Sequence, residues 1–234
     1  MGKQLLTVCS ATVLTVSLGA VLIASDIANS GATPGAQDWI SLFDGNTLNG
    51  WIQKNGTADY RVEDGAIVGR TSTGSPNSFL CTFNEFGDFV LEFDVMLHDN
   101  ELNSGVQIRS RTRPPEGDAE YGRVNGPQVE IESSSTGSPE SGYIYGEAAG
   151  GWLVSDEDRV HHQVFRDGEW NHYRIEAEGP RIQVWINGQK ITDLWHEESY
   201  KNYPRGFIGL QVHSIPDDEG PYEVAWKNIR IKPL

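Results

Sequence analysis

Cysteine is scarce in this sequence, and its scarcity excludes a fold that depends on disulfide bonds. The chain has 2 cysteines in 234 residues. Cys9 lies in an apolar N-terminal segment, which leaves Cys81 as the only cysteine in the rest of the chain. One cysteine cannot form an intramolecular disulfide, so the domain must be stabilised by its core. Because Cys81 stands in the apolar run SFLCTF, we expect a buried small side chain and not a nucleophile.

Basic residues are also few, which excludes nucleic-acid binding through the overall electrostatic field. The chain has 18 Lys and Arg against 33 Asp and Glu, a formal net charge of −15. No glycine-rich phosphate loop opens a helix, and no Cys or His spacing is typical of a metal site. Two acidic segments, 98–104 and 216–220, have the oxygen ligands that a structural Ca²⁺ needs, but such loops are usually only solvated. The sequence therefore predicts no required cofactor.

The N-terminus has the composition of a secretory signal. Lys3 gives it a positive start, an apolar stretch runs over residues 5–24, and small residues follow, with plausible cleavage after Ala24 or Ala32. The apolar stretch is long for a signal, so an uncleaved membrane anchor stays open. We expect a signal or anchor over residues 1–32, a short polar lead-in over 33–37 and an exported domain, periplasmic or extracellular, over 38–234.

Helical periodicity is missing from that domain, since no stretch keeps it for 11 residues. Runs with alternating apolar and polar residues recur instead, separated by Gly, Pro, Asn and Asp. Asp64-Gly65 and Asn187-Gly188 each join two such runs and predict tight hairpins. About a dozen short strands in one domain indicate an all-β fold, an antiparallel β-sandwich or jelly roll.

Three of these runs carry an unusual polar side. In SGVQIRSR, PQVEIES and GFIGLQVH, every second residue is apolar, while the others are rich in Arg, Gln, Glu and His and poor in Lys. A solvated face of an antiparallel sheet explains the alternation but not this choice of residues, which hold directional hydrogen bonds. We therefore expect one face to bring together Gln107, Arg109, Gln128, Glu130, Gln211 and His213.

Several short motifs resemble one family. WISLFDGNTLNGW, NSGVQIRS, PQVEIES, GEWNHYRIEAEGPRIQVWINGQKI, GFIGLQVHS and WKNIRIKPL, in this order, are similar to the 3-keto-disaccharide hydrolases, from about Trp39 to Leu234. The resemblance implies a concanavalin-like jelly roll related to the laminarinase-type glycoside hydrolases. It also implies a carbohydrate ligand, and in some members cleavage of glycosides that carry a ketone at C3. Laminarinase-type enzymes have a Glu-x-Asp-x-x-Glu strand. Here Glu130-Ile131-Glu132 is followed by Ser135 in the third position, which argues against ordinary retaining hydrolysis.

A 3-keto sugar needs fewer catalytic groups, because the ketone acidifies the proton at C2. One base removes that proton, and a donor stabilises the developing enolate. We expect Glu130 or Glu132 to be the base, with Arg109 paired to Glu130 if their strands are neighbours, and His213 as a neutral donor or a proton shuttle. The substrate-binding amides would be Gln107, Gln128 and Gln211.

The loop IYGEAAGGWLV adds a candidate aromatic wall, formed by Tyr145 and Trp152 around a glycine-rich segment. Trp152 could equally plug the core. Two other classes of function stay open at this point: a non-catalytic carbohydrate-binding module and a structural domain of the cell envelope. The first would bind glycans without releasing a product, and the second would do neither.

Overall fold

Strands dominate the computed structural model, which describes residues 1–2, 38–117, 119–136 and 140–234. Apart from Met1 and Gly2, the predicted signal and lead-in lie outside the described residues. Within the described part, the only helix is α1 (Glu197–Asn202), and none is long and apolar enough to cross a membrane. The His196 side chain caps α1 by accepting a hydrogen bond from the backbone N–H of Ser199.

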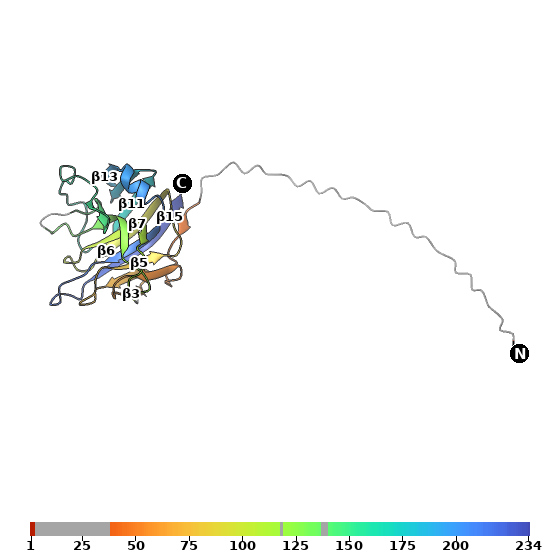
Figure 1. The fold of residues 1–234 in the computed structure, drawn as a ribbon. Coiled ribbons are helices and arrows are strands. Elements are labelled where there is room, and N and C mark those ends of the chain that lie inside the picture. Colours follow the sequence, from red (N-terminus) through yellow and green to blue (C-terminus); the bar gives the residue numbers. More distant parts are fainter. Residues whose placement is uncertain (3–37, 118, 137–139) are drawn as a thin grey trace. The chain divides into compact units, whose positions relative to one another are not determined.

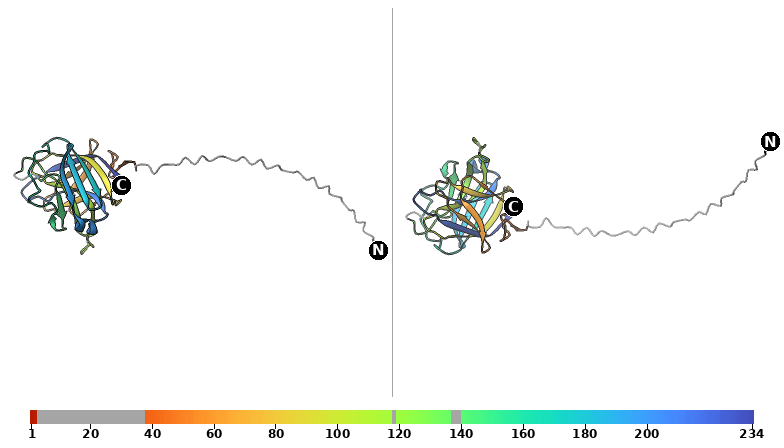
Figure 2. Two further views of the ribbon diagram at one scale, coloured as in Figure 1. Left: turned by 90° about the horizontal axis from the view of Figure 1, so that it is seen from above. Right: turned by 90° about the horizontal axis from the view of Figure 1, so that it is seen from below.

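The strands of the described residues form two antiparallel sheets. The first has the order β13 (Gln189–Trp195), β12 (Arg181–Ile186), β11 (Asn171–Glu178), β6 (Phe89–Leu97), β15 (Glu223–Pro233), β4 (Ala66–Arg70), β3 (Asp59–Glu63), and β1 (Ile40–Ser41) pairs with β15. The second has the order β10 (Gly151–Trp152), β9 (Ile144–Glu147), β8 (Val124–Ile131), β7 (Ser104–Thr112), β14 (Phe207–Val212), β5 (Ser78–Thr82), β2 (Trp51–Lys54). Figures 1 and 2 show the two layers, with β11 and β15 in the first sheet and β5 and β7 in the second. The predicted antiparallel β-sandwich is confirmed.

The core lies between the two sheets and is filled by alternate residues of each strand. On β6 these are Phe89, Leu91, Phe93, Val95 and Leu97, each at most 1% exposed. From the second sheet, Val106, Ile108, Val129, Ile131, Leu210 and Val212 enter the same cluster. Neighbouring residues of a strand point to opposite faces. The polar residues that stand between the apolar ones of the second sheet therefore lie on the outer face of that sheet.

Both predicted hairpins are present. Asp64-Gly65 joins β3 to β4 with φ angles of 49° and 76°, and Asn187-Gly188 joins β12 to β13 with φ angles of 50° and 82°. Positive φ at both central residues is the requirement of a type I′ turn, which Asn-Gly and Asp-Gly meet at low cost. These turns fix the strand register at the two opposite edges of the first sheet.

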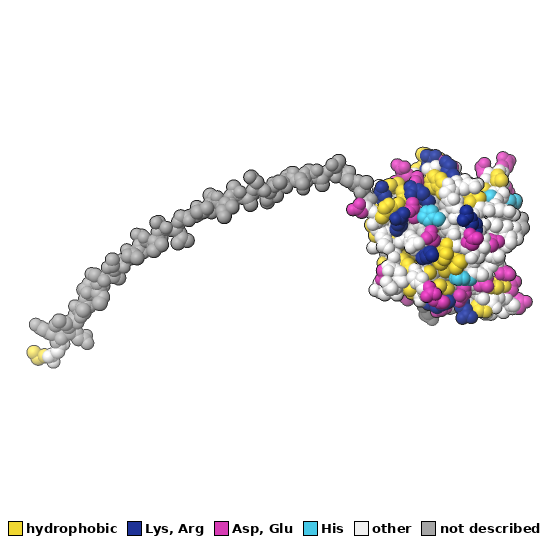
Figure 3. Space-filling view, turned by 180° about the vertical axis from the view of Figure 1, so that it is seen from behind, with side chains coloured by type: hydrophobic (Ala, Val, Ile, Leu, Met, Phe, Trp, Pro, Cys, Tyr) yellow, Lys and Arg dark blue, Asp and Glu magenta, His cyan; other side chains and the backbone are white. Residues whose placement is uncertain are grey.

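The surface is mixed in charge. Acidic and basic side chains are interspersed over the face seen in Figure 3. On the outer side of the first sheet, the half-buried Arg174 and the exposed Arg230 both bind the buried Glu92. These two cations lower the pKa of Glu92 against the opposing effect of its burial.

Candidate functional site

The outer face of the second sheet gathers most of the predicted site residues in adjacent cross-strand rows. Gln128 on β8 lies opposite Gln107 on β7 and opposite Tyr145 on β9. In the next row, Gly105 of β7 lies between Glu130 of β8 and Gln211 of β14. Strand pairing thus brings together residues that are up to about a hundred positions apart in the sequence.

These rows border a hollow of about 330 Å³, here named the polar hollow. Six predicted residues line it: Gln128, Glu130, Tyr145, Trp152, Gln211 and His213. Five further residues complete the lining: Asn77, Asn103, Arg123, Glu140 and Glu147. Nearly every lining side chain carries a hydrogen-bonding or charged group, which suits a ligand that has an oxygen on almost every carbon.

A chain of buried hydrogen bonds holds the carboxyl group of Glu130. Ser110 Oγ donates to Gln107 Oε1 at 2.6 Å, and Gln107 Nε2 donates to Gln128 Oε1 at 2.6 Å. Gln128 Nε2 then donates to Glu130 Oε1 at 2.7 Å. Each bond fixes the orientation of the next amide, so the chain positions the carboxyl group. Gln107 lies beside Gln128 on the neighbouring strand, is fully buried and does not line the polar hollow, so it supports Gln128 instead of contacting a ligand as predicted.

Gly105 makes room for this arrangement. A Cβ atom at Gly105 would lie 2.6 Å from Cδ of Gln128 and 2.8 Å from its Nε2. Such distances are far inside van der Waals contact, so any other residue would displace the Gln128 amide. The absence of a side chain between Glu130 and Gln211 is therefore a condition for the polar hollow.

Gln211 supplies an unused donor. Its side chain is 1% exposed, and its Oε1 lies 3.4 Å from Gln128 Nε2. Its Nε2 has no hydrogen-bond partner among the residues that the structure describes. A buried amide nitrogen without a partner is costly unless a ligand satisfies it, so this N–H group is suited to bind a ligand oxygen in the polar hollow.

The carboxyl group of Glu130 is only 6% exposed. Burial raises its pKa to about 8; the hydrogen bonds from Gln128 and Asn103 oppose this, and the nearby Glu132 and Glu147 add to it. The group is therefore mainly protonated at neutral pH and gains its charge in the mildly alkaline range. A carboxyl group with this pKa can both accept and donate a proton near physiological pH.

His213, which follows β14, lines the same hollow from a half-buried position. Its Nδ1 lies 2.7 Å from the carbonyl oxygen of Ser214. Because a carbonyl oxygen only accepts, Nδ1 carries the proton, and the Nε2 of the neutral ring is an acceptor. His213 can thus donate from Nε2 only as an imidazolium, so the sequence-based expectation of a neutral donor is corrected here.

Arg109 does not lie in the polar hollow, and its predicted pairing with Glu130 is wrong. The register of β7 against β8 shifts between Gln107 and Arg111, and Arg109 sits in this bulge with a φ of 51°. Its buried guanidinium donates to the carbonyl oxygens of Gly87 and Gly179, both at 2.7 Å, and to Asp88 at 2.8 Å. These residues border strands of the first sheet, so Arg109 ties the two sheets together.

Glu132 is also separated from the polar hollow. It follows the end of β8 and does not belong to the lining residues. Its Oε2 accepts a hydrogen bond from the backbone N–H of Glu140 at 3.0 Å. Glu132 therefore binds the backbone at Glu140, and Glu130 is the one of the two carboxylates that a ligand in the hollow would reach.

Tyr145 and Trp152 form one side of the polar hollow. They are paired across β9 and β10, and their rings meet edge to face with centroids 5.3 Å apart. Trp152 is half-buried, packs against the main core and has the guanidinium of Arg159 4.2 Å from its ring centroid. The same indole is thus both part of the wall and part of the core packing.

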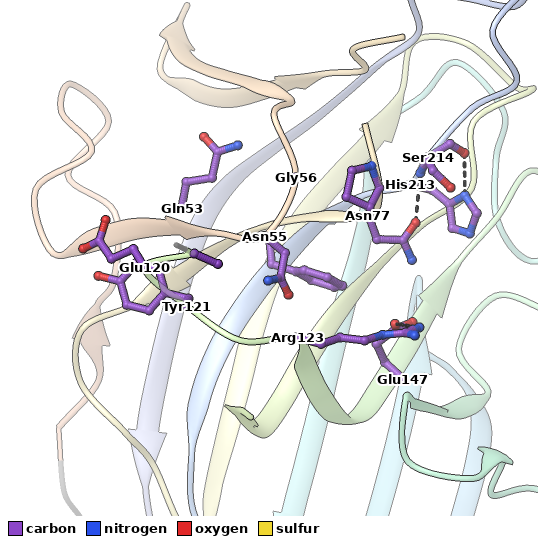
Figure 4. Close-up of a pocket in the computed structure, with 13 residues that line it drawn as sticks. Gln53, Asn55, Gly56, Asn77, Glu120, Tyr121, Arg123, Glu147, His213 and Ser214 are labelled. Carbon is purple, nitrogen blue, oxygen red and sulfur yellow. Dashed lines mark hydrogen bonds and ion pairs between the residues drawn. The ribbon is translucent and has the colours of Figure 1, made fainter. Parts of the chain in front are cut away.

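Arg123 and Glu147 are site residues that sequence reasoning missed. Arg123 Nη2 lies 3.0 Å from Oε1 of the buried Glu147, and Figure 4 shows the two side chains together. Glu147 could have been found, because it stands two residues after Tyr145 on the same strand and so shares its face. Arg123 precedes β8 in a loop, where alternation gives no signal.

The described residues contain no group of three or more His, Cys, Asp or Glu side chains that could hold a metal ion. In the acidic segment 98–104, Asp99 instead accepts a hydrogen bond from the backbone N–H of Glu223 at 2.7 Å. The expectation that no cofactor is required stays a prediction.

Comparisons with known proteins agree on family and fold. The sequence profile of the 3-keto-alpha-glucoside-1,2-lyase-like domain matches residues 38–232. Among solved structures, a candidate glycosyl hydrolase from Parabacteroides distasonis ATCC 8503 is 21% identical, with 84% of this chain and 94% of that chain covered and a TM-score of 0.56. The carbohydrate-binding module CBM66 of Bacillus subtilis is 18% identical, with coverages of 80% and 98% and a TM-score of 0.56.

A Bacillus subtilis protein with a galectin-like fold is 10% identical, with coverages of 79% and 90% and a TM-score of 0.55. A search of curated protein sequences gives no match. At such low identities the structural likeness establishes the fold, and the profile match establishes the family.

Proposed function

Because the chain belongs to the 3-keto-alpha-glucoside-1,2-lyase-like domain family, we propose that its polar hollow binds glycosides oxidised to a ketone at C3 and cleaves them. The observation that carries this proposal is the buried Glu130 carboxyl group, held by Gln128 in a hollow lined almost entirely by polar groups. Removal of a weakly acidic C–H proton needs a base whose pKa lies near the ambient pH.

The reaction begins at C2 of the sugar. The Glu130 carboxylate takes the C2 proton, and the electrons of the C2–H bond form a C2=C3 double bond while negative charge moves to the C3 oxygen. When the ketone re-forms, the electrons move to a C1=C2 double bond, and the aglycone oxygen leaves C1 and takes up a proton. Water then adds across C1=C2, with its hydroxyl group on C1 and its proton on C2. Atoms and charges balance without a redox cofactor.

Three groups suit the charges that develop. The unpartnered Nε2 of Gln211 is available to donate to the C3 oxygen as it becomes an enolate. Arg123, which is ion-paired with Glu147, lines the same hollow. His213 as an imidazolium, or Glu130 after it has taken the C2 proton, would supply the proton to the leaving oxygen. Tyr145 and Trp152 would bound the sugar ring on one side.

The pH dependence of the rate tests the role of Glu130. We expect kcat/KM for a 3-keto-glucoside to rise with pH and to reach half its maximum near pH 8, because burial raises the pKa of Glu130 to about 8 and only the carboxylate can take the proton. The measurement is aglycone release across neutral and alkaline pH, corrected for the spontaneous rate in each buffer. A profile that stays flat over this range would exclude Glu130 as the base.

A carbohydrate-binding module is the second candidate function. The fold it shares with CBM66 favours this possibility, since that structure is itself a binding module. The same polar hollow would then bind a sugar, and the Glu130 carboxyl group would serve as a hydrogen-bonding partner without chemistry. The two candidate functions differ in one result: the enzyme would release a product from a 3-keto-glycoside, and the binding module would not.

We also propose that the domain acts outside the cytoplasm. The apolar stretch over residues 5–24, preceded by Lys3 and followed by small residues, supports this. This proposal is tested by fractionating cells: the protein should be found in the periplasmic or culture fraction, in a form shortened by the length of the signal.

A further inference from the structure

A second, larger hollow adjoins the polar one. This hollow, here named the side groove, has a volume of about 770 Å³ and shares Asn77, Arg123, Glu147 and His213 with the polar hollow. Figure 4 shows it, with Gln53 and Tyr121 on the side away from the shared residues and Asn55 in the middle. A ligand in the polar hollow would therefore have a direct path into the side groove past four common side chains.

The amides that line the side groove are largely engaged within the protein. Asn55 donates from Nδ2 to Gly122 O at 3.0 Å, and its Oδ1 accepts the backbone N–H of Val124. Gln53 donates from Nε2 to the carbonyl oxygen of Ala58 at 2.8 Å. Asn77 Oδ1 accepts the backbone N–H of Ser214 at 2.9 Å. These amides therefore offer little to a sugar, whose hydroxyl groups each need a partner. The polar side chains that remain in the lining are Glu120, Tyr121 and Ser214 and the shared Arg123, Glu147 and His213.

The apolar part of the lining comes from Pro76, Phe79, Ala119 and Tyr121. Phe79 belongs to a small buried cluster with Cys81, Val124 and Phe207 on this face of the sheet. The half-buried Tyr121 is connected to this cluster by Lys54, whose Nζ lies 5.1 Å from the Tyr121 ring centroid and 4.5 Å from that of Phe207. A lysine between two rings fixes their spacing through cation–π attraction. The Tyr121 ring is thus a positioned aromatic surface at the groove.

We propose that the side groove is the aglycone subsite and that it takes a flat, apolar aglycone such as a phenyl ring rather than a second sugar. This inference rests on the proposed function, in which the group on C1 leaves from a sugar held beside Glu130. That group has to project from the polar hollow, and the side groove shares a wall with it. A phenyl ring can pack on Tyr121 without needing the engaged amides.

Variants of Tyr121 test this assignment with three substrates: phenyl 3-keto-glucoside, methyl 3-keto-glucoside and a 3-keto-disaccharide. For each substrate, kcat/KM of a variant is divided by that of the wild type, so that differences in leaving-group ability cancel. Loss of one aromatic contact of about 0.5–1.5 kcal/mol predicts a two- to tenfold fall for Tyr121→Ala on the phenyl substrate. The methyl substrate and the disaccharide should change little.

Two further variants serve as controls. Tyr121→Phe keeps the ring and should retain the wild-type preference. Phe83→Ala removes an aromatic side chain that is 64% exposed and lies outside both hollows, so all three ratios should stay near one. An equal fall of Tyr121→Ala on all substrates, no fall on any, or the largest fall on the disaccharide would overturn the assignment.

Binding of unreactive ligands separates this inference from the proposed function. Calorimetry with phenyl and methyl 1-thioglucosides should show tighter binding of the phenyl compound by the wild type and a loss of that preference in Tyr121→Ala. If this preference exists but no 3-keto-glycoside is cleaved, the proposed function fails and the side-groove assignment stands. If 3-keto-glycosides are cleaved without any phenyl preference in binding or rate, the side-groove assignment fails and the proposed function stands.

Discussion

Replacing Glu130 by Gln is expected to lower kcat for a 3-keto-glucoside by about 10²–10⁴-fold, the usual contribution of a general base. The amide cannot take the C2 proton, whereas its oxygen can still accept the hydrogen bond from Gln128 Nε2. Glu132→Gln is the matched control, because Glu132 lies outside the polar hollow and accepts from the Glu140 backbone. We expect that variant to keep nearly the wild-type rate.

The Glu130→Gln variant should also fold, which a melting curve checks. The pKa of Glu130 is raised on folding to about 8, so its contribution to stability is complete at acidic pH and is lost as pH rises through this value. Gln does not titrate, and the variant should therefore melt at or above the wild-type temperature at alkaline pH. A folded Glu130→Gln variant with full activity would exclude Glu130 as the base, and a loss confined to Glu132→Gln would reverse the assignment.

Replacing Arg109 by Met is expected to destabilise the fold by about 2–5 kcal/mol, since each buried group left without a partner costs about 1–3 kcal/mol. The change would leave the carbonyl oxygens of Gly87 and Gly179 without their donor and would remove the ion pair to Asp88. Denaturant unfolding measures the effect. The rate per folded molecule should stay close to that of the wild type.

Arg205→Met is the matched control for this change. Arg205 is largely exposed and lies 3.8 Å from Glu85, so its loss should cost no more than about 1 kcal/mol. Wild-type stability of Arg109→Met combined with a large fall in rate would show that Arg109 acts in catalysis after all.

The residues on each face of the second sheet could largely be predicted from the sequence, because β7, β8 and β14 each have one apolar side. Alternation in PQVEIES and GFIGLQVH correctly assigned Gln128, Glu130 and Gln211 to one face, and strand pairing then brought them together. Arg109 shows where this reasoning stops. A bulge shifts the register by a local change of backbone that alternation cannot reveal, and the side chain leaves its expected face.

Several other lining residues come from loops, and their meeting depends on topology. Asn77 and Asn103 precede β5 and β7, and they meet because β14 lies between these two strands in the sheet. Arg123 precedes β8 at the other end of the β7–β8 pair and joins the lining through its ion pair with Glu147. No local pattern encodes that strand order. The burial of Glu130, and with it the rise of its pKa, likewise depends on these loops and could not be predicted from the strand alone.

The central claim is that the polar hollow cleaves glycosides only after C3 has become a ketone. Its most direct test is phenol release by the wild-type protein from phenyl 3-keto-glucoside and from the same phenyl glucoside with its C3 hydroxyl group intact. Without the ketone the C2 proton is not acidic, so we predict release from the keto compound alone. Similar rates on both compounds would contradict proton abstraction at C2, and binding of both with release from neither would identify a carbohydrate-binding module.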